Sequence, residues 1–415
     1  MGAVELKDKY FVGTTEKNPL EYNIGEEIVF KIRVMELDKP FDVPYVSYTI
    51  TADDGQNLEG FAEKKDGWFY IKTTLKKCGF VTVFADACDE NKKVMEDVEQ
   101  YKGGAGANIF EIECGSEIPE DYEEFWQGLR DEVEAFDNEV LYCEKKEDEN
   151  YPDFEMYDMR ISAPEDTFVS LAVAYPKGAK KDSLKFLMFF RGHGVYPNPP
   201  IPVDGCFTIR INAHPIPNYE PEEYYKSLGE NELKDYGMSY QDRPENTYWK
   251  KLFIRNLTAV KYFKNHELIN KKDYLFAGGS QGGMQAINMT AHSKIATGGI
   301  FEIVWMADIK GYKKFGRIKN QQPKGIGNTY FDSAIAAKYI KCPVFIESGL
   351  GDSICPPATQ MAIHNAIKTP KYHEFYQNLW HYTVPNRDSN ICYAIGDKKV
   401  IEEHPEFIEI HKVVE

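Results

Sequence analysis

Residues 274–287 read YLFAGGSQGGMQAI, an apolar run that meets glycines and one serine before it turns apolar again. Gly278, Ser280 and Gly282 satisfy the pattern G-x-S-x-G, in which a serine lies on a sharp turn between a strand and a helix. We predict a strand before these glycines and a helix after them, so the context fits the pattern. A glycine-rich loop whose serine only caps the helix is the alternative that this segment alone leaves open.

Around this turn, from residue 114 to 415, short apolar runs alternate with amphipathic segments. VSLAVAYP, KFLMFF, GCFTIRIN, GIFEIVWM, CPVFIESG and HEFYQNL predict strands, whereas TYWKKLFIRNLTAVKYFKN and ATQMAIHNAIK predict helices. Such alternation is typical of an α/β fold with a doubly wound, mostly parallel sheet that helices cover on both faces. Reactive groups in such folds gather at the carboxyl ends of the strands.

The first part of the chain, residues 1–113, shows a different pattern. EEIVFKIRV, YVSYTIT, GWFYIKTTL, GFVTVFADA and ANIFEIE predict short strands separated by turn residues, with almost no helical periodicity. We therefore expect an N-terminal β-sandwich domain of immunoglobulin-like type, followed at residue 114 by the α/β domain. The GGAGA stretch at 103–107 lacks dinucleotide-binding spacing and opens no helix, so we interpret it as a plain loop.

The composition and charge of the chain disfavour some classes of partner and location. The chain of 415 residues carries 66 acidic and 49 basic side chains and a formal charge of -17, which disfavours nucleic acid and anionic membranes as partners. The start of the chain has neither a basic nor an apolar leader, so we expect a cytoplasmic protein; a secreted or periplasmic one is the alternative if a leader precedes Met1. The eight scattered cysteines form no C-x-x-C pair and predict reduced thiols.

A serine nucleophile needs a histidine base and an acid that orients it. In strand-turn-helix folds of this kind the acid and then the histidine follow the serine, after the last strands of the sheet. Asp352 follows the predicted strand CPVFIESG, and His381 follows the final strand-like run. We therefore predict a catalytic triad of Ser280, Asp352 and His381. Asp308 is the second choice for the acid, and Glu347 lies within a strand, where a structural role is more common.

The other histidines fit the base position less well. His373 begins its strand and would lie at the wrong edge of the sheet, and the remaining candidates occupy helices, helix ends or the C-terminal tail: His266, His292, His364, His404 and His411. A structural role is the usual one for a single histidine.

Acyl transfer also needs donors for the developing oxyanion. We predict the backbone N–H of Gln281, which follows the nucleophile, and that of His193 in KFLMFFRGHGVYP. The His193 imidazole is an alternative substrate contact. Tyr196, Trp305 and Trp380 are aromatic candidates for stacking on a sugar, although core packing is as good an interpretation of Trp305. Nothing in the sequence implies a metal or an organic cofactor.

Three motifs together resemble carbohydrate esterase family seven, the acetyl xylan esterases and cephalosporin C deacetylases of the α/β-hydrolase superfamily. They are EEFWQGLRDEV, GGSQGG and YFDSAIAAKYIKCPVFIESGLGDSICPPATQMAIHNAI, and the resemblance covers roughly residues 115–400. It implies removal of acetyl groups from sugar hydroxyls, with the same triad and the same oxyanion donors.

The sequence departs from that family at three places. Asn212, Ala213 and His214 stand near the position of its R-G-Q motif, and Tyr382 replaces a glutamate after the catalytic histidine. The β-rich first part is absent from its shorter members. We therefore include His214 and Tyr382 among the candidate substrate contacts.

These observations predict a serine esterase that works through an acyl-enzyme, with a small acetylated sugar or oligosaccharide as its partner. A hydrolase of longer acyl chains or a peptidase on the same fold is the first alternative. The second is an inactive hydrolase scaffold that only binds carbohydrate. The resemblance implies a homo-oligomer, which the added β-domain could block, so the oligomeric state stays open.

Overall fold

The computed structural model describes residues 7–318, 322–381 and 390–413. Its centre is a mixed sheet with the strand order β10-β11-β12-β14-β13-β15-β16-β17-β18-β19. The neighbours from β14 to β18 in this order pair in parallel, and the strands at both edges pair antiparallel. The bounds are β10 Val140–Lys146, β11 Phe154–Ala163, β12 Thr167–Pro176, β13 Leu184–Phe190, β14 Cys206–Ile211, β15 Ile269–Gly279, β16 Gly298–Glu302, β17 Val344–Gly349, β18 Lys371–Tyr376 and β19 Cys392–Gly396.

Helices cover this sheet on both faces, but unequally. The larger core joins one face to a first group of five helices, and the smaller core joins the other face to a second group of two short C-terminal helices. The first group comprises α1 Tyr122–Ala135, α3 Tyr248–Phe263, α4 Gln281–His292, α6 Ser333–Ala336 and α7 Pro357–Ala366, and the second comprises α8 Lys399–Glu403 and α9 Glu406–His411. The predicted α/β-hydrolase architecture is confirmed. None of the helices in the described ranges is long and apolar enough to cross a membrane.

Connecting elements complete the α/β part. They are η1 Ile109–Glu111, α2 Glu222–Glu230, η2 Pro244–Asn246, α5 Gly311–Phe315, η3 Ile326–Phe331 and η4 Ala337–Tyr339. The eight cysteines are free thiols.

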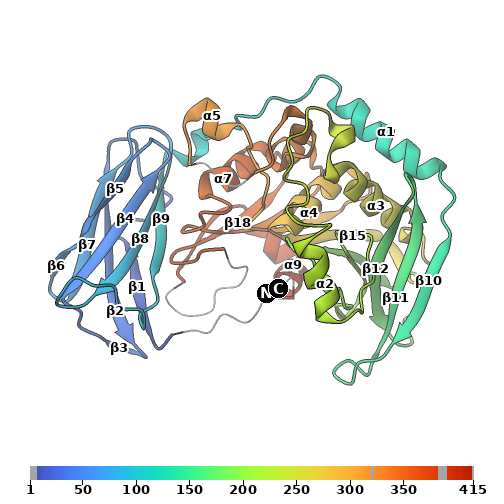
Figure 1. Cartoon of the computed structure of the whole chain (residues 1–415), viewed down its shortest axis with the longest axis horizontal. Coiled ribbons are helices and arrows are strands. Elements are labelled where there is room, and N and C mark those ends of the chain that lie inside the picture. Colours follow the sequence, from blue (N-terminus) through green and yellow to red (C-terminus); the bar gives the residue numbers. More distant parts are fainter. Residues whose placement is uncertain (1–6, 319–321, 382–389, 414–415) are drawn as a thin grey trace.

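The N-terminal part is a β-sandwich, as predicted, and Figure 1 shows it at the left of the view. One sheet has the order β1-β2-β7-β6 with β3 beside β2, and the other has the order β5-β4-β8-β9. Their facing apolar side chains form a separate core. The bounds are β1 Lys9–Thr15, β2 Glu27–Glu36, β3 Lys39–Pro40, β4 Tyr45–Ala52, β5 Asn57–Phe61, β6 Glu63–Lys65, β7 Trp68–Thr74, β8 Gly79–Cys88 and β9 Tyr101–Ala107.

Three local predictions were wrong in whole or in part. The GGAGA stretch is not a loop, because it forms the end of β9, and ANIFEIE is not a strand, because its central residues Ile109–Glu111 form the short helix η1. Glycines have no side chain to create an alternating pattern, so a glycine strand gives no periodic signal. In GIFEIVWM the strand β16 ends at Glu302, and the chain then turns through positive φ at Ile303 and Met306. That the chain divides into two domains at residue 114 stays a prediction.

Candidate active site

Ser280 lies between the end of β15 and the start of α4, on a backbone with φ 55° and ψ -118°. A positive φ is unfavourable for a residue with a side chain, so the surrounding structure must hold this turn. The Ser280 N–H donates to the carbonyl of Glu302 at 3.0 Å, and the Ser280 carbonyl accepts from the N–H of Met284 at 3.1 Å. This turn at residues 278–282, which we call the elbow, therefore projects the serine side chain beyond the carboxyl end of the sheet, as the G-x-S-x-G pattern requires.

The glycines around Ser280 are required by close backbone contacts. A Cβ on Gly282 would lie 2.0 Å from the carbonyl oxygen of Phe190, and a Cβ on Gly278 would lie 2.6 Å from the Gly282 backbone. Only hydrogen fits at these distances, because strand and helix pass each other with no side chain between them. The G-x-S-x-G spacing thus has a steric cause in this chain.

The structure brings Ser280, Asp352 and His381 together. His381 Nε2 lies 3.0 Å from Ser280 Oγ, and His381 Nδ1 lies 2.8 Å from Asp352 Oδ2. The other carboxylate oxygen of Asp352 accepts from the N–H groups of Ile354 at 2.7 Å and Cys355 at 2.9 Å. Asp352 is fully buried and the His381 side chain is only 9% exposed.

These hydrogen bonds assign the histidine tautomer. An ionised carboxylate can only accept, so the proton of a neutral His381 lies on Nδ1. Nε2 then has a free lone pair that accepts the hydroxyl proton of Ser280. Such an arrangement can remove that proton while the hydroxyl attacks a carbonyl carbon, and the buried carboxylate can stabilise the imidazolium that results.

The backbone N–H of Gln281 is suited to bind an oxyanion, because Gln281 is the first residue of α4 and its N–H has no acceptor within the helix. In the loop after β13, the N–H of Gly194 donates to the Tyr236 hydroxyl at 2.9 Å. Among the hydrogen bonds of the described residues, none uses the N–H of His193. Of these two loop amides, His193 is therefore the one that is free to serve as the second donor.

Side chains tie this loop to the elbow. The Gln281 side-chain oxygen accepts from the Tyr236 hydroxyl at 2.8 Å and from His193 Nδ1 at 3.2 Å. The rings of His193 and Tyr236 stack with their centroids 4.7 Å apart. Sequence reasoning missed Tyr236, which lies in a loop far from both motifs and has no pattern of its own.

His214 is fully buried behind the same loop. Its Nε2 lies 3.1 Å from the Gly194 carbonyl, and its Nδ1 lies 2.7 Å from the Tyr248 hydroxyl. Burial lowers the pKa of His214 to about 4, so the ring is neutral at pH 7. Both ring nitrogens are therefore engaged inside the protein, where His214 supports the loop, and a contact of His214 with the substrate stays a prediction.

The other candidate substrate contacts differ in exposure. Tyr196 is 41% exposed, with the Arg191 guanidinium 4.8 Å above its ring. Trp305 is buried and packs edge-on against Trp249, with 5.5 Å between ring centroids, which favours its interpretation as a core residue. The indole N–H of Trp380 donates to Ser353 Oγ at 2.9 Å. Tyr382 lies outside the described residues.

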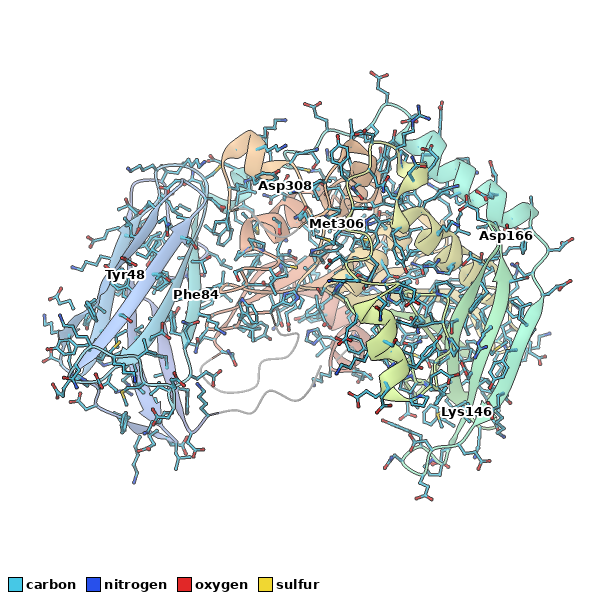
Figure 2. The ribbon with its side chains drawn as sticks, viewed as in Figure 1. Tyr48, Phe84, Lys146, Asp166, Met306 and Asp308 are labelled. Atoms are coloured by element: carbon cyan, nitrogen blue, oxygen red, sulfur yellow. The ribbon has the colours of Figure 1, made fainter. Side chains whose placement is uncertain are left out.

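The two alternative acids form hydrogen bonds or ion pairs with residues outside the triad. Asp308 forms an ion pair with Arg317 and accepts from the N–H of Gly115 at 2.5 Å, and Figure 2 shows it near α5. Burial raises the pKa of Asp308 to about 6, although Arg317 opposes this shift. Glu347 is buried in β17, 2.7 Å from His411.

His373 is buried in β18 and lies 2.9 Å from Ser348 Oγ. It is the third residue of this strand rather than the first, and its hydrogen bond goes to Ser348, not to a triad residue.

One group in the site has the residue types of a metal centre. Ligand atoms of Asp352, Cys355 and His381 lie within 4.8 Å of one another. Two of these side chains are the hydrogen-bonded acid and histidine described above. Burial raises the pKa of the Cys355 thiol well above its usual value, so the thiol is protonated and a poor metal ligand. The donor set therefore fits a triad better than a metal site.

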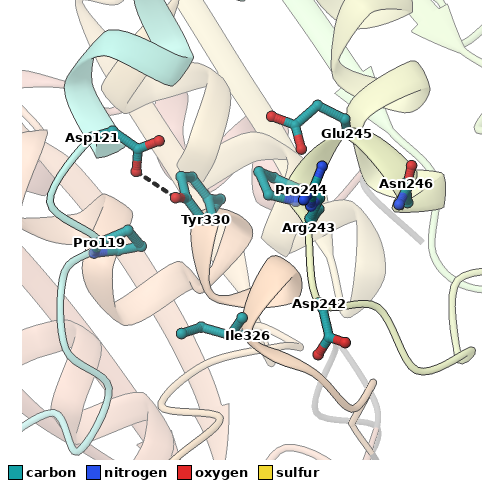
Figure 3. Close-up of a pocket in the computed structure, with 9 residues that line it drawn as sticks. All are labelled: Pro119, Asp121, Asp242, Arg243, Pro244, Glu245, Asn246, Ile326 and Tyr330. Atoms are coloured by element: carbon teal, nitrogen blue, oxygen red, sulfur yellow. Dashed lines mark hydrogen bonds between the residues drawn. The ribbon is translucent and has the colours of Figure 1, made fainter.

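A cavity of about 450 Å³ lies at a different place, between the start of α1 and the turn before α3 (Figure 3). None of the triad residues lines it, and Tyr330 donates a hydrogen bond to Asp121 across one of its walls. Its lining consists of Pro119, Asp121, Asp242, Arg243, Pro244, Glu245, Asn246, Ile326 and Tyr330. This cavity has no nucleophile paired with a base.

Comparisons with known proteins identify the family to which the chain is similar. Residues 107–395, more than half of the chain, match the model of the acetyl xylan esterase (AXE1) family. The acetyl esterase Axe7A of Xylanibacter ruminicola is 24% identical over 370 residues, which are 84% of this chain and 82% of that protein.

Two solved structures are similar in fold. The acetyl xylan esterase from Paenibacillus sp. R4 has a TM-score of 0.55 at 17% identity and covers 73% of this chain and 98% of its own. Acetyl xylan esterase 1 from Thermoanaerobacterium sp. JW/SL YS485 has a TM-score of 0.52 at 19% identity and covers 68% of this chain and 93% of its own. The family match and these likenesses agree with the geometry around Ser280: the chain belongs to the acetyl xylan esterase family and is a carboxylic ester hydrolase.

Proposed function

We propose that this hydrolase removes acetyl groups from acetylated carbohydrates, such as xylo-oligosaccharides, through an acyl-enzyme on Ser280. The observation that carries the proposal is the geometry of the serine. Its hydroxyl lies on a positive-φ turn, 3.0 Å from a histidine that is itself 2.8 Å from a buried carboxylate. The family membership and the acetyl esterase relative support the choice of an acetyl ester as the substrate.

In the first half-reaction, Ser280 Oγ attacks the acetyl carbonyl carbon while His381 Nε2 takes the hydroxyl proton. The N–H groups of Gln281 and His193 hold the negative oxygen of the tetrahedral intermediate. When this intermediate collapses, the bond to the sugar oxygen breaks, and the imidazolium gives its proton to that oxygen. The sugar leaves with a free hydroxyl, and the acetyl group stays on Ser280.

Water completes the cycle. His381 removes a proton from a water molecule as its oxygen attacks the acetyl carbon, and the same histidine then returns the proton to Ser280 Oγ. Asp352 stays ionised and stabilises the imidazolium in both halves. The products are acetate and the regenerated serine.

The test is the hydrolysis of p-nitrophenyl acetate by the wild type and by Ser280→Ala. We expect kcat to fall by roughly 10⁴-fold or more in the variant, because the nucleophile and its proton transfer are both lost. Ser293→Ala is a matched control, since both serines are 8% exposed and Ser293 ends the same helix at its far end. Undiminished turnover by Ser280→Ala would remove Ser280 from the mechanism.

Substrate choice needs a separate assay. Acetate release is to be measured from acetylated xylan, acetylated mannan, acetylated monosaccharides and a cephalosporin, with butyryl and peptide substrates for comparison. We expect the acetylated carbohydrates to give the highest kcat/KM. A preference for butyryl or peptide substrates would contradict the proposal.

A further inference from the structure

The β-sandwich contacts the two loops that present the acid and the histidine. We call residues 349–352 the acid loop and residues 377–381 the base loop. Strand β9, the glycine-rich strand that sequence reasoning interpreted as a loop, lies on the side of the sandwich nearest α7 and β18 (Figure 1). Its residues 102–104 contact both loops.

The three backbones touch with no side chain between them. A Cβ on Gly104 would lie 2.3 Å from the carbonyl oxygen of Leu350, and a Cβ on Gly351 would lie 2.0 Å from that of Lys102. The acid loop meets the base loop as closely, since a Cβ on Gly349 would lie 2.5 Å from the carbonyl oxygens of both Leu379 and Trp380. Glycine at 104, 349 and 351 is therefore required by packing.

Gln377 fixes the start of the base loop on the sandwich. Its side chain is fully buried, accepts from the N–H of Gly104 at 2.8 Å and donates to the Gly104 carbonyl at 3.0 Å. The same amide donates to Thr14 Oγ1 of β1 at 3.2 Å. The Gln377 amide pairs with both the backbone N–H and the backbone carbonyl of Gly104. Moving it is costly in free energy, because any shift leaves buried polar groups without hydrogen-bond partners.

Asn378 makes the next pair of bonds. Its side-chain oxygen accepts from the N–H of Lys102 at 2.9 Å, and its side-chain nitrogen donates to the Phe11 carbonyl at 3.1 Å. Its backbone has φ 55°, a left-handed conformation that turns the chain towards His381. In addition, the Lys102 ammonium lies 4.7 Å from the ring centroid of Trp380, the residue before His381.

Backbone hydrogen bonds then join the two loops. The N–H of Gly351 donates to the Leu379 carbonyl at 3.0 Å, and just before the base loop the carbonyl of Tyr376 in β18 accepts from the N–H of Leu350 at 2.9 Å. Asp352 follows Gly351 directly. The position of the carboxylate relative to the imidazole is therefore determined by a small unit that is built on β9.

We infer that the N-terminal β-sandwich is a positioning part of the catalytic site: β9 holds the acid and base loops in register so that His381 reaches Ser280. This inference rests on the proposed function. Gln377 and Asn378 touch neither Ser280 nor the Asp352 carboxylate in these hydrogen bonds, so they are positioning residues that act through His381.

The test variant is Asn378→Gly, because glycine keeps the left-handed backbone and removes only the two side-chain bonds to the sandwich. We expect kcat for p-nitrophenyl acetate to fall about tenfold while KM stays within about twofold, since a small displacement of the base impairs proton transfer more than substrate binding. The rate at which a fluorophosphonate labels Ser280 falls by the same factor.

The control is Lys77→Ala, which removes a different contact of the sandwich with the α/β part. The Lys77 ammonium donates to the Phe315 carbonyl, near the place where Asp53 accepts from the N–H of Ile318 at 2.9 Å, and neither contact involves the acid or base loop. We expect Lys77→Ala to leave kcat and labelling unchanged. Melting temperatures of both variants show how much stability each has lost.

The outcomes separate the two proposals. If Ser280→Ala is inactive but Asn378→Gly has the wild-type kcat, the positioning role is wrong and the triad stands. If Lys77→Ala lowers kcat as much as Asn378→Gly does, the effect is general destabilisation and the inference fails. If Ser280→Ala keeps its turnover, the proposed function itself fails.

Discussion

The two halves of the candidate triad are built in different ways. The serine side is local: β15, the turn and α4 are consecutive in the sequence, and two glycines let strand and helix pass at van der Waals distance. The acid and base side is assembled from two loops and from β9, more than two hundred residues earlier in the chain. The nucleophile is thus fixed by its own segment, whereas its partners depend on long-range contacts.

This difference has a consequence for how each half fails. The elbow is a strained turn inside a packed core, so a change there disturbs both folding and chemistry. The acid and base loops follow the ends of β17 and β18, so we expect a change there to displace the loops without unfolding the sheet. Three substitutions, two of them with a comparison variant, test this contrast, and they are ordered here from the largest expected effect to the smallest.

Asp352→Asn removes the negative charge of the carboxylate that is hydrogen-bonded to His381. The amide can still hydrogen-bond to His381, but it favours the wrong tautomer and cannot stabilise an imidazolium, so we expect kcat to fall about 10⁴-fold with little loss of stability. Steady-state hydrolysis of p-nitrophenyl acetate measures the change.

Asp308→Asn is the comparison for that variant, since it removes the carboxylate that was the second choice for the acid. It should lose stability, because it leaves Arg317 buried without its ion pair, yet keep kcat within a few fold when assayed well below its melting temperature. A larger loss of kcat in Asp308→Asn than in Asp352→Asn would reverse the assignment.

Gly282→Ala disturbs the close packing of strand and helix at the elbow. The added Cβ would lie 2.0 Å from the Phe190 carbonyl oxygen, so strand and helix must separate. We expect a loss of about 1–3 kcal/mol in the free energy of unfolding and at least a hundredfold loss of kcat, on the order expected for misplaced reacting groups. Chemical denaturation and steady-state kinetics on the same preparation measure both effects.

Gly128→Ala is the matched glycine variant, because a Cβ there meets nothing within 4 Å and the residue lies inside α1. We expect its free energy of unfolding to rise by about 0.5–1 kcal/mol and its kcat to stay unchanged. Equal behaviour of the two glycine variants would mean that the close approach at Gly282 is not a constraint.

The third substitution concerns His214, which is buried behind the loop next to the elbow and should affect the pH dependence of stability. Its pKa falls from 6.5 to about 4 on burial, so it contributes stability that is present above pH 6.5 and is lost as the pH falls towards 4. One such group adds a slope of about 1.4 kcal/mol per pH unit in that window. His214→Gln, which does not titrate, should show a shallower pH dependence of the free energy of unfolding between pH 7 and 4. Identical slopes for variant and wild type would contradict the burial of a neutral ring.

Much of the fold and of the candidate site follows from local sequence. The G-x-S-x-G spacing and the alternation of strands and helices reflect contacts between neighbouring elements. Asp352 and His381 could be picked out because each follows the end of a strand, and the structure brings both side chains to Ser280. The family match begins at Ala107, the last residue of β9, so the sandwich before it lies outside the match.

What sequence reasoning missed depends on distant contacts. The glycines of β9 serve a close approach to Leu350 and Gly351, which no local pattern reveals. The edge strand β10 and its neighbour β11 were not predicted, and β10 is mostly exposed and lacks a buried face. His214 is polar and lies in a loop, yet it is fully buried because Tyr248 and the Gly194 carbonyl satisfy both ring nitrogens.

The central claim is that Ser280 is a nucleophile whose reactivity depends on His381. The most direct measurement is the rate of fluorophosphonate labelling, with the labelled peptide identified by mass spectrometry, in the wild type and in His381→Ala. We predict that the label in the wild type lies on Ser280 and that the rate falls at least a hundredfold in His381→Ala. Labelling of another residue, or an unchanged rate at Ser280 without His381, would contradict the account.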